Sequence, residues 1–366
     1  MTAGRHPMHG PNRLKLGIFS ANAEGGLALT RAPERWPARW PQIVEAARIA
    51  DRAGLEFFLP IARWKGYGGV TNGREWSFET LTHAAALAGA TERIALFATV
   101  HVPMVHPVFA AKALATIDHA SNGRAGLNIV CGWHPEEFAM FGVPMIEERY
   151  AQGLEWFEIV RRIYTEDSPF DFHGGFYDLC NVSGQPRPLQ QPWPVTLNAG
   201  FSPAGRDFAA RAADVLLTTF VEIEDGRAHV ADIHARAAAH GRNVGVCATA
   251  HVVCRTTQNE AEDYYEWYAV TMEDTAAADH YMGTKEKFSG SHDPLAYRLH
   301  RKRFVGGGGT YPLVGTPEAI AEQLVRISAA GFAGVALSFV NYSAELPYFI
   351  ATVLPLLREA GLRDAP

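Results

Sequence analysis

Short β-rich runs alternate with amphipathic helical segments along almost the whole chain, and this alternation restricts the fold more than any other feature. The pattern predicts strands at 15–20, 56–60, 94–99, 125–130, 195–199, 215–219, 244–253 and 334–339. It predicts helices at 41–53, 77–91, 107–121, 146–164, 203–213, 223–241, 317–330 and 344–360. Eight strands that alternate strictly with eight helices predict an α/β fold, the (β/α)8 TIM barrel, with residues 1–366 as a single domain.

A doubly wound open sheet is the alternative arrangement for such a pattern. That fold normally carries a glycine-rich phosphate loop after its first strand. Residues 20–26 read SANAEGG at this position and lack a GxGxxG pattern. The four glycines at 306–309 follow no predicted strand and precede no lysine in P-loop register, so we interpret them as a flexible hinge.

Two segments are longer than a minimal barrel needs, and they follow the fourth and the seventh predicted strands. Residues 168–194 are rich in proline, glycine and aromatic residues, and we expect an ordered insertion at the barrel mouth. Residues 256–311 are expected either to form a lid over an aromatic ligand or to pack on the barrel exterior or a neighbouring subunit. This second insertion contains four closely spaced aromatic residues, Tyr264, Tyr265, Trp267 and Tyr268. Residues 1–13 are expected to form a flexible N-terminal tail.

Composition and motifs exclude several classes of protein. The formal net charge is −6 and no run of lysine or arginine is present, so nucleic acid is not an expected partner. The apolar runs are too short to span a membrane, and the N-terminus lacks the apolar segment of a signal peptide. The four cysteines have no CxxC spacing and there is no HExxH motif, so we expect neither disulfides nor a metal site. These features are typical of a cytoplasmic enzyme.

The loop that follows the fourth predicted strand is the most informative part of the sequence. Residues 126–138 read GLNIVCGWHPEEF, so an apolar strand breaks at Gly132 and continues with an indole, an imidazole and two carboxylates. In a (β/α)8 barrel such a loop lies at the carboxyl ends of the strands, where active sites are built. We therefore expect the chemistry of this protein at that strand exit.

The sequence resembles the bacterial luciferase-like flavin-dependent monooxygenases over about residues 14–357. The likeness is carried by segments 115–118, 123–124, 128–133, 148–150, 172–177, 186–192, 198–206 and 313–318. Within the family, the chain is most similar to the subgroup of pyrimidine monooxygenase and dimethylsulfone monooxygenase. The resemblance implies a (β/α)8 barrel that uses reduced FMN and O2 and receives its reduced flavin from a separate NAD(P)H-dependent flavin reductase. It also implies a homodimer or a homotetramer.

The resemblance also implies roles for individual residues. The flavin ring site falls on Ile61, Ala62, Asn128 and Glu137, and the phosphate and ribityl contacts fall on Arg149, Tyr150 and Ser202. The catalytic oxygen pocket falls on Leu59, Thr99, Asn128 and Trp133.

Part of this assignment makes chemical sense from the residues alone. Arg149 offers a forked cation for a phosphate, and Ser202 precedes a proline at a helix start, where free N–H groups favour an anion. In the oxygen pocket an apolar wall leaves room for O2, while the Thr99 hydroxyl and the Asn128 amide can hydrogen-bond it. Without the family, Arg149 and Tyr150 could equally be a helix-surface pair, and Thr99 a core residue.

The substrate position departs from that of alkanesulfonate monooxygenase, a more distant member of the family. His251 matches a histidine on its seventh strand, but Thr249 replaces the strand arginine. The arginine of its lid falls near Val305, although Arg303 is close enough to substitute. Loss of fixed guanidinium groups removes the bidentate clamp that a sulfonate needs, so we expect a neutral or weakly polar substrate.

Other candidates for substrate contacts follow the second and third strands. They are Trp64, Tyr67, His101 and His106, while His251 is either a hydrogen-bonding group for the substrate or a satisfied core histidine.

The resulting hypothesis is an FMNH2-dependent, two-component monooxygenase. It would oxidise or cleave a small organic substrate at a C–N, C–S, amide, carbonyl or sulfur centre. An F420-dependent oxidoreductase or a flavin-degrading lyase on the same fold is one alternative, and a non-catalytic flavin-binding protein is another.

Overall fold

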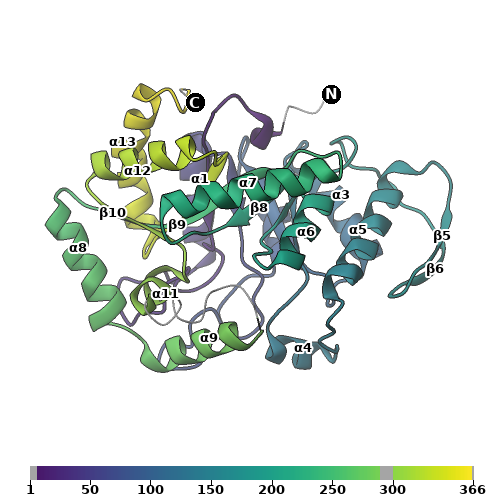
Figure 1. The fold of residues 1–366 in the computed structure, drawn as a ribbon, viewed down its shortest axis with the longest axis horizontal. Coiled ribbons are helices and arrows are strands. Elements are labelled where there is room, and N and C mark those ends of the chain that lie inside the picture. Colours follow the sequence, from purple (N-terminus) through teal and green to yellow (C-terminus); the bar gives the residue numbers. More distant parts are fainter. Residues whose placement is uncertain (1–5, 289–299, 365–366) are drawn as a thin grey trace.

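The computed structural model describes residues 6–288 and 300–364, and they form an α/β barrel (Figure 1). Among these residues, eight parallel strands pair in the order β1, β2, β3, β4, β7, β8, β9, β11, and β11 pairs with β1 to close the barrel. The strands are β1 (Lys15–Phe19), β2 (Phe57–Leu59), β3 (Ala95–His101), β4 (Ala125–Val130), β7 (Val195–Asn198), β8 (Val215–Thr218), β9 (Gly245–Cys254) and β11 (Gly334–Ser338). Each overlaps one predicted strand, so the prediction of a TIM barrel is confirmed.

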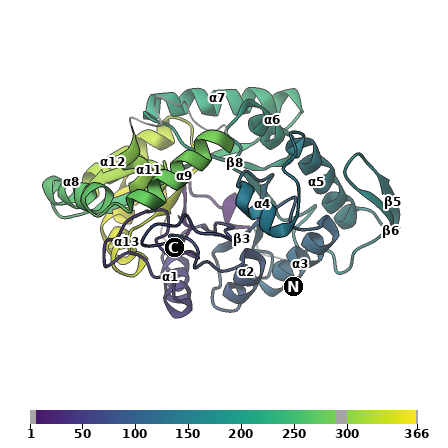
Figure 2. The same cartoon turned by 90° about the horizontal axis from the view of Figure 1, so that it is seen from below.

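Helices surround the strands, as the alternation predicts. They are α1 (Trp40–Arg52), α2 (Thr80–Ala88), α3 (Pro107–Ala120), α5 (Arg149–Thr165), α6 (Pro203–Ala212), α7 (Ile223–Ala239), α12 (Pro317–Ala329) and α13 (Tyr342–Glu359). Local chemistry sets some of the starts. Ser202 and Thr316 cap α6 and α12 with their side-chain oxygens, and each is followed by a proline whose missing N–H costs nothing there. Figure 2 shows the ring of helices from below. None of the helices within the described residues is long and apolar enough to cross a membrane.

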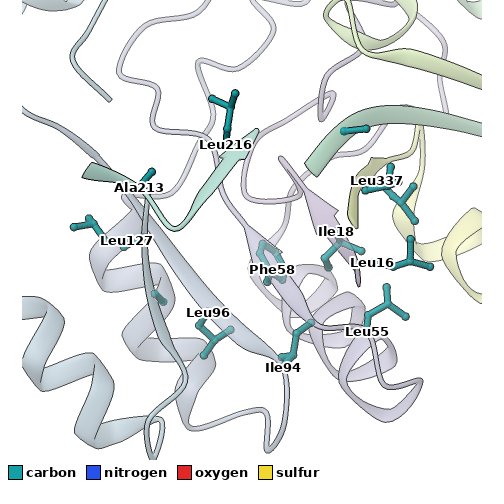
Figure 3. Close-up of a cluster of buried hydrophobic side chains, with 14 of the residues drawn as sticks. Leu16, Ile18, Leu55, Phe58, Ile94, Leu96, Leu127, Ala213, Leu216 and Leu337 are labelled. Atoms are coloured by element: carbon teal, nitrogen blue, oxygen red, sulfur yellow. The ribbon is translucent and has the colours of Figure 1, made fainter. Parts of the chain in front are cut away.

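The hydrophobic core has one layer between strands and helices and another inside the barrel. The outer layer is shown in Figure 3 and includes Leu16, Ile18, Leu55, Phe58, Ile94, Leu96, Leu127, Leu216 and Leu337. The interior is filled by the alternate strand residues, among them Phe57 and Phe97. Gly17 and Gly126 leave room for these two rings, because a Cβ at either glycine would lie less than 3.0 Å from the neighbouring phenyl ring.

Residues 6–13 were expected to belong to a flexible tail, but they close the amino end of the barrel. They include a short 3-10 turn, η1 (Pro7–His9), and His6 is 4% exposed with its ring edge-on to Phe97 at 6.3 Å. This turn shields the apolar side chains at the amino end of the barrel interior from solvent. Residues 1–5 of the expected tail lie outside the described residues.

Besides η1 and the elements inside the two insertions, the structure contains two elements near the strand exits that the sequence prediction lacks. The loop after β4 contains a short helix, α4 (Pro135–Phe141), and a further strand, β10 (Tyr311–Gly315), pairs in parallel with the outer half of β9. β8 pairs only with the first residues of β9, so the rest of that edge carries unpaired backbone groups that β10 satisfies. Figure 1 shows α4 at the same end of the barrel as α9 (Thr275–Phe288).

The insertion at 168–194 forms a hairpin of β5 (Phe170–His173) and β6 (Asp178–Val182) beside α5 (Figures 1 and 2). The carboxylate of Glu155 in α5 accepts hydrogen bonds from the backbone N–H groups of Gly175 and Phe176. These bonds tie the hairpin to the outside of the barrel. The expected position at the barrel mouth is thereby corrected.

The insertion at 256–311 contains α8 (Gln258–Glu266), the π-helical turn η2 (Trp267–Thr271), α9 and α11 (Arg301–Gly307). Residues 289–299 of the expected lid lie outside the described residues. The aromatic residues of α8 and η2 pack into a second core that includes Val253 of β9 and Phe304 of α11. Of the two alternatives drawn from the sequence, packing on the barrel is therefore the one that the structure shows for these rings.

The glycine run at 306–309 forms a close contact in place of the expected flexible hinge. A Cβ on Gly307 would lie less than 3.0 Å from three atoms of the His251 side chain, and one on Gly306 would lie 2.5 Å from Tyr265. Gly308 ends α11 at a φ of 65°, in the left-handed region that favours glycine. Because these glycines have no side chains, α11 can pack directly against β9.

Candidate active site

A cavity of about 270 Å³ lies at the carboxyl ends of the barrel strands, the usual place for an active site in this fold. Its wall is formed by the strand exits together with α9 and the end of α11. Nine residues that the sequence singled out line it: Ile61, Ala62, Tyr67, Thr99, His101, Asn128, Trp133, Arg149 and Tyr150. Thr249, which replaces the arginine of the more distant relative, lines it as well.

Thr99 and Asn128 form an oriented pair at the exits of β3 and β4. The Thr99 hydroxyl donates to the carbonyl oxygen of Pro60 at 2.6 Å and accepts from Nδ2 of Asn128 at 3.1 Å. Because a hydroxyl has one proton, this pair fixes the direction of the amide. Oδ1 of Asn128 is then buried without a partner among the described residues. An unpaired buried acceptor costs about 1–3 kcal/mol, so this oxygen suits the N–H or O–H group of a ligand.

The loop after β2 is held by two side chains that do not line the cavity. Asn22 makes two hydrogen bonds to the backbone of Ile61, at 2.8 and 2.9 Å. Glu137 accepts from the N–H of Trp64 at 2.9 Å and pairs with the guanidinium of Arg63 at 3.1 Å. The side chain of Glu137 is only 1% exposed and does not line the cavity. It therefore positions this loop in the structure, and its contact with a flavin stays a prediction.

A candidate anion site lies where α5 and α6 begin. Arg149 is the first residue of α5, and the hydroxyl of Tyr150 is 3.5 Å from Oγ of Ser202, the N-cap of α6. Arg149 makes no ion pair with any residue in 6–288 or 300–364. Ser202 itself does not line the cavity. An unpaired arginine beside two helix N-termini provides the charge and the N–H donors that bind phosphate.

His251 and Arg303, two expected substrate residues, are buried behind the cavity wall. His251 shares a hydrogen bond of 2.9 Å with Oγ1 of Thr310, and burial lowers the pKa of its imidazole to about 3. The Arg303 guanidinium donates to the carbonyl oxygens of Gly309 and Thr310 and to Oγ1 of Thr219. These hydrogen bonds link the end of α11 to the segment after β8 and occupy the donors of the guanidinium. Neither side chain lines the cavity, so the expected contact of both residues with substrate is corrected. His251 is a core histidine, but it is not fully satisfied, because its buried Nε2 has no partner among the described residues.

Three other predicted residues also lie outside the cavity lining. Leu59 is fully buried in the barrel interior, and the ring of Trp64 packs on Phe141 with 4.9 Å between centroids. His106 caps the start of α3, where its ring nitrogen accepts from the N–H of Val108 at 3.4 Å. A strand residue whose side chain points into the barrel core cannot reach the mouth, which explains the position of Leu59.

His101 does line the cavity, as expected from the sequence. Its Nδ1 has no partner among the described residues, and burial lowers the pKa of the imidazole to about 3. The ring is therefore neutral near pH 7 and offers a ligand a hydrogen bond without a charge.

A second charged group at the cavity was missed in the sequence. It consists of Arg74, from the loop after β2, and of Tyr281 and Lys285, from α9. The Arg74 guanidinium lies over the rings of Tyr67 at 5.3 Å and Tyr281 at 4.9 Å. No motif joins these residues, because the loop after β2 and the insertion at 256–311 are far apart in the chain.

The family model for luciferase-like monooxygenases matches residues 14–334. This chain belongs to the luciferase-like monooxygenase family. The assignment confirms the resemblance drawn from the sequence and the expectation of a monooxygenase.

Two relatives of this luciferase-like monooxygenase match almost its full length. FMNH(2)-dependent dimethylsulfone monooxygenase of Pseudomonas putida is 34% identical over 360 residues, which cover 94% of this chain and 96% of the relative. Pyrimidine monooxygenase RutA of Allorhizobium ampelinum is 27% identical over 362 residues, which cover 94% and 96%. Both belong to the subgroup expected from the sequence.

A solved structure of riboflavin lyase with modified FMN and riboflavin has the same fold. The TM-score is 0.85, with 24% identity, and the match covers 96% of this chain and 93% of that chain. At this identity the likeness concerns the fold alone.

Proposed function

We propose that this luciferase-like monooxygenase is the oxygenase of a two-component system, assembled as a homodimer or homotetramer. It takes reduced FMN from a separate NAD(P)H-dependent flavin reductase and uses O2 to oxidise or cleave a small organic substrate. Its similarity to the FMNH(2)-dependent dimethylsulfone monooxygenases supports this function. One observation carries it: a single cavity joins the unpaired amide oxygen of Asn128 to the anion site at Arg149.

The lining residues fit FMN. Arg149 and the N-terminal end of α6 would hold its phosphate, and the hydroxyl of Tyr150 is placed for the ribityl chain. The backbone at Ile61 and Ala62 would border the ring, and Oδ1 of Asn128 would accept one of its N–H groups. This contact would remove the cost of leaving that oxygen unpaired.

Reduced FMN, when bound, supplies the two electrons that activate O2, so that one oxygen atom enters the substrate and the other leaves as water. The residues of this chain supply position and surroundings. The Thr99 hydroxyl donates its hydrogen bond to the carbonyl oxygen of Pro60, so it can only accept from the Asn128 amide and thereby fixes the orientation of that amide. Neutral His101 adds a hydrogen-bonding group without a charge, and α9 with the end of α11 forms part of the cavity wall.

The proposal is tested by anaerobic titration of the apo-protein with reduced FMN, followed by mixing with oxygenated buffer. We expect saturable binding and a rate of reoxidation that differs from that of free reduced FMN. Arg149→Ala should weaken binding at least about tenfold, because a charged hydrogen-bonding partner is lost. Asn128→Ala should keep most of the affinity but lose substrate oxygenation.

Two results would reject parts of this proposal. If the wild-type chain fails to bind reduced FMN while it reduces or oxidises F420, the protein is an F420-dependent oxidoreductase. If Asn128→Ala binds flavin and oxygenates substrate normally, the amide has no catalytic role. The need for a reductase is checked with NADH and FMN in the absence of any second protein, where we expect no turnover.

A further inference from the structure

We propose that Arg74 and Lys285 bind an oxyanion group of the substrate, so that this enzyme acts on a small organic anion. Carboxylates, sulfinates and sulfonates share the compact delocalised charge that such a site recognises. The inference rests on the proposed function, because it takes the cavity to be the substrate site. It replaces the neutral substrate expected from the sequence.

The charge of the cavity wall differs in sign from that of the whole chain. The chain has 39 acidic residues against 33 lysines and arginines. Among the described residues, however, the wall includes Arg63, Arg74, Arg149 and Lys285 and no carboxylate. Glu137 compensates the charge of Arg63 from behind the wall. Arg149 lies at the anion site proposed for the phosphate of FMN, which leaves Arg74, whose Nε has no partner among the described residues, as the anchor for a second anion. Lys285 lies over the same Tyr281 ring as Arg74 and adds positive potential there.

Arg74 is built into the structure in an unusual way. Its φ is 72°, in the left-handed region that residues other than glycine rarely adopt, and the residue is 4% exposed. Nη2 donates to the carbonyl oxygen of Leu27 at 2.8 Å, but the buried Nε has no partner among the described residues. The guanidinium also pairs with no carboxylate of residues 6–288 and 300–364. A strained backbone and an unpaired buried N–H are what a bound oxyanion would explain.

Tyr281 and Lys285 of α9 lie beside Arg74 at the cavity wall. They are four residues apart and so lie on one face of the helix, and both line the cavity. The hydroxyl of Tyr281 donates to the carbonyl oxygen of Gly308 at 3.1 Å. Burial alone would raise the pKa of Tyr281, but the charges of Lys285 and Arg74 outweigh it and lower the pKa. The same positive potential favours a negatively charged group of a ligand.

This position is separate from the anion site at Arg149. Arg74 contacts Leu27, which follows β1, whereas Arg149 follows β4. Arg74 itself lies in the loop after β2, and β3 separates β2 from β4, so the two cationic groups reach the cavity from different strand exits. One exit suits the phosphate of FMN and the other suits the anionic group of a substrate.

The test compares two probes of similar shape, dimethyl sulfone and methanesulfonate, in which a charged oxygen replaces one methyl group. Binding of each to the full chain is measured anaerobically by calorimetry, with and without FMN. We expect methanesulfonate to bind at least about tenfold more tightly than the sulfone. Arg74→Gln should abolish this preference and leave FMN affinity within about twofold.

Control variants separate a local role from a general effect of charge. Lys285→Gln should weaken methanesulfonate binding several-fold, and it tests the site even if Arg74→Gln does not fold. Lys287→Gln removes the same charge from an exposed position on the same helix and should change nothing.

Two outcomes would overturn the proposal. Equal affinity of the wild-type protein for both probes would do so. So would loss of FMN affinity, rather than of anion preference, in Arg74→Gln, because Arg74 would then belong to the cofactor site. Failure of the wild-type chain to bind FMN would instead contradict the proposed function, since the preference between the probes is also measured without flavin.

Discussion

Replacing Glu137 by alanine should destabilise this protein and loosen the loop that borders the proposed flavin site. The side chain is 1% exposed, pairs with Arg63 at 3.1 Å and accepts from the N–H of Trp64 at 2.9 Å. Alanine removes both interactions and leaves the Arg63 guanidinium, itself 8% exposed, charged and without its carboxylate.

The size of the effect follows from this geometry. Removal of one partner of a buried ion pair costs about 3–5 kcal/mol of the free energy of unfolding. Arg63 lines the cavity and lies over the ring of Trp133 at 5.1 Å, so its charge is partly compensated without Glu137 and we expect a smaller loss, about 2–3 kcal/mol. Glu137→Gln keeps the shape and one acceptor and should cost about half as much. The pair Arg63→Met with Glu137→Leu removes both charges and should recover most of the loss.

Urea unfolding, followed by tryptophan fluorescence, measures this order of stabilities, and anaerobic titration measures the affinity for reduced FMN separately. The reasoning is refuted if Glu137→Ala unfolds within about 0.5 kcal/mol of wild type, the range of ordinary surface changes. It is also refuted if the double variant is no more stable than Glu137→Ala. A Glu137→Gln protein of normal stability that no longer binds reduced FMN would point to direct contact with the flavin, as the family resemblance implies.

Three further predictions follow from single contacts. Gly307→Ala should cost about 1–3 kcal/mol by urea unfolding because its Cβ would collide with His251, whereas Gly283→Ala, with open space around it, should not destabilise. Burial lowers the pKa of His83 to about 3 in the folded state. Below pH 6.5 the imidazole therefore binds a proton in the unfolded state but not in the folded state, so the free energy of unfolding decreases as the pH falls below 6.5. His83→Phe should therefore reduce the loss of stability between pH 7.5 and 5.0 by about 1–2 kcal/mol, and an unchanged pH dependence would contradict this assignment. Thr99→Val should lower oxygenation at least about tenfold with nearly unchanged flavin affinity, and an equal loss of both would show that Thr99 only supports the fold.

The sequence by itself determined the barrel and the edge of it where the site lies. Buried parallel strands need short, nearly continuous apolar runs whatever surrounds them, so 125–130 and 195–199 are recognisable without knowledge of their neighbours. Thr99 and Asn128 stand on two such strands, near their carboxyl ends. Their meeting in one cavity follows directly from the pairing of β3 with β4.

Only the tertiary structure decided which charged side chains face the cavity. Arg303 lies in α11 of the insertion at 256–311 and Arg74 lies in the loop after β2, and the sequence favoured the first. The approach of α11 to β9, which Gly307 permits, directs Arg303 onto backbone carbonyls instead. Arg74 faces the cavity because its left-handed backbone and the ring of Tyr281 on α9 place it there. Side-chain direction in such segments depends on contacts between distant parts of the chain, and no local periodicity records them.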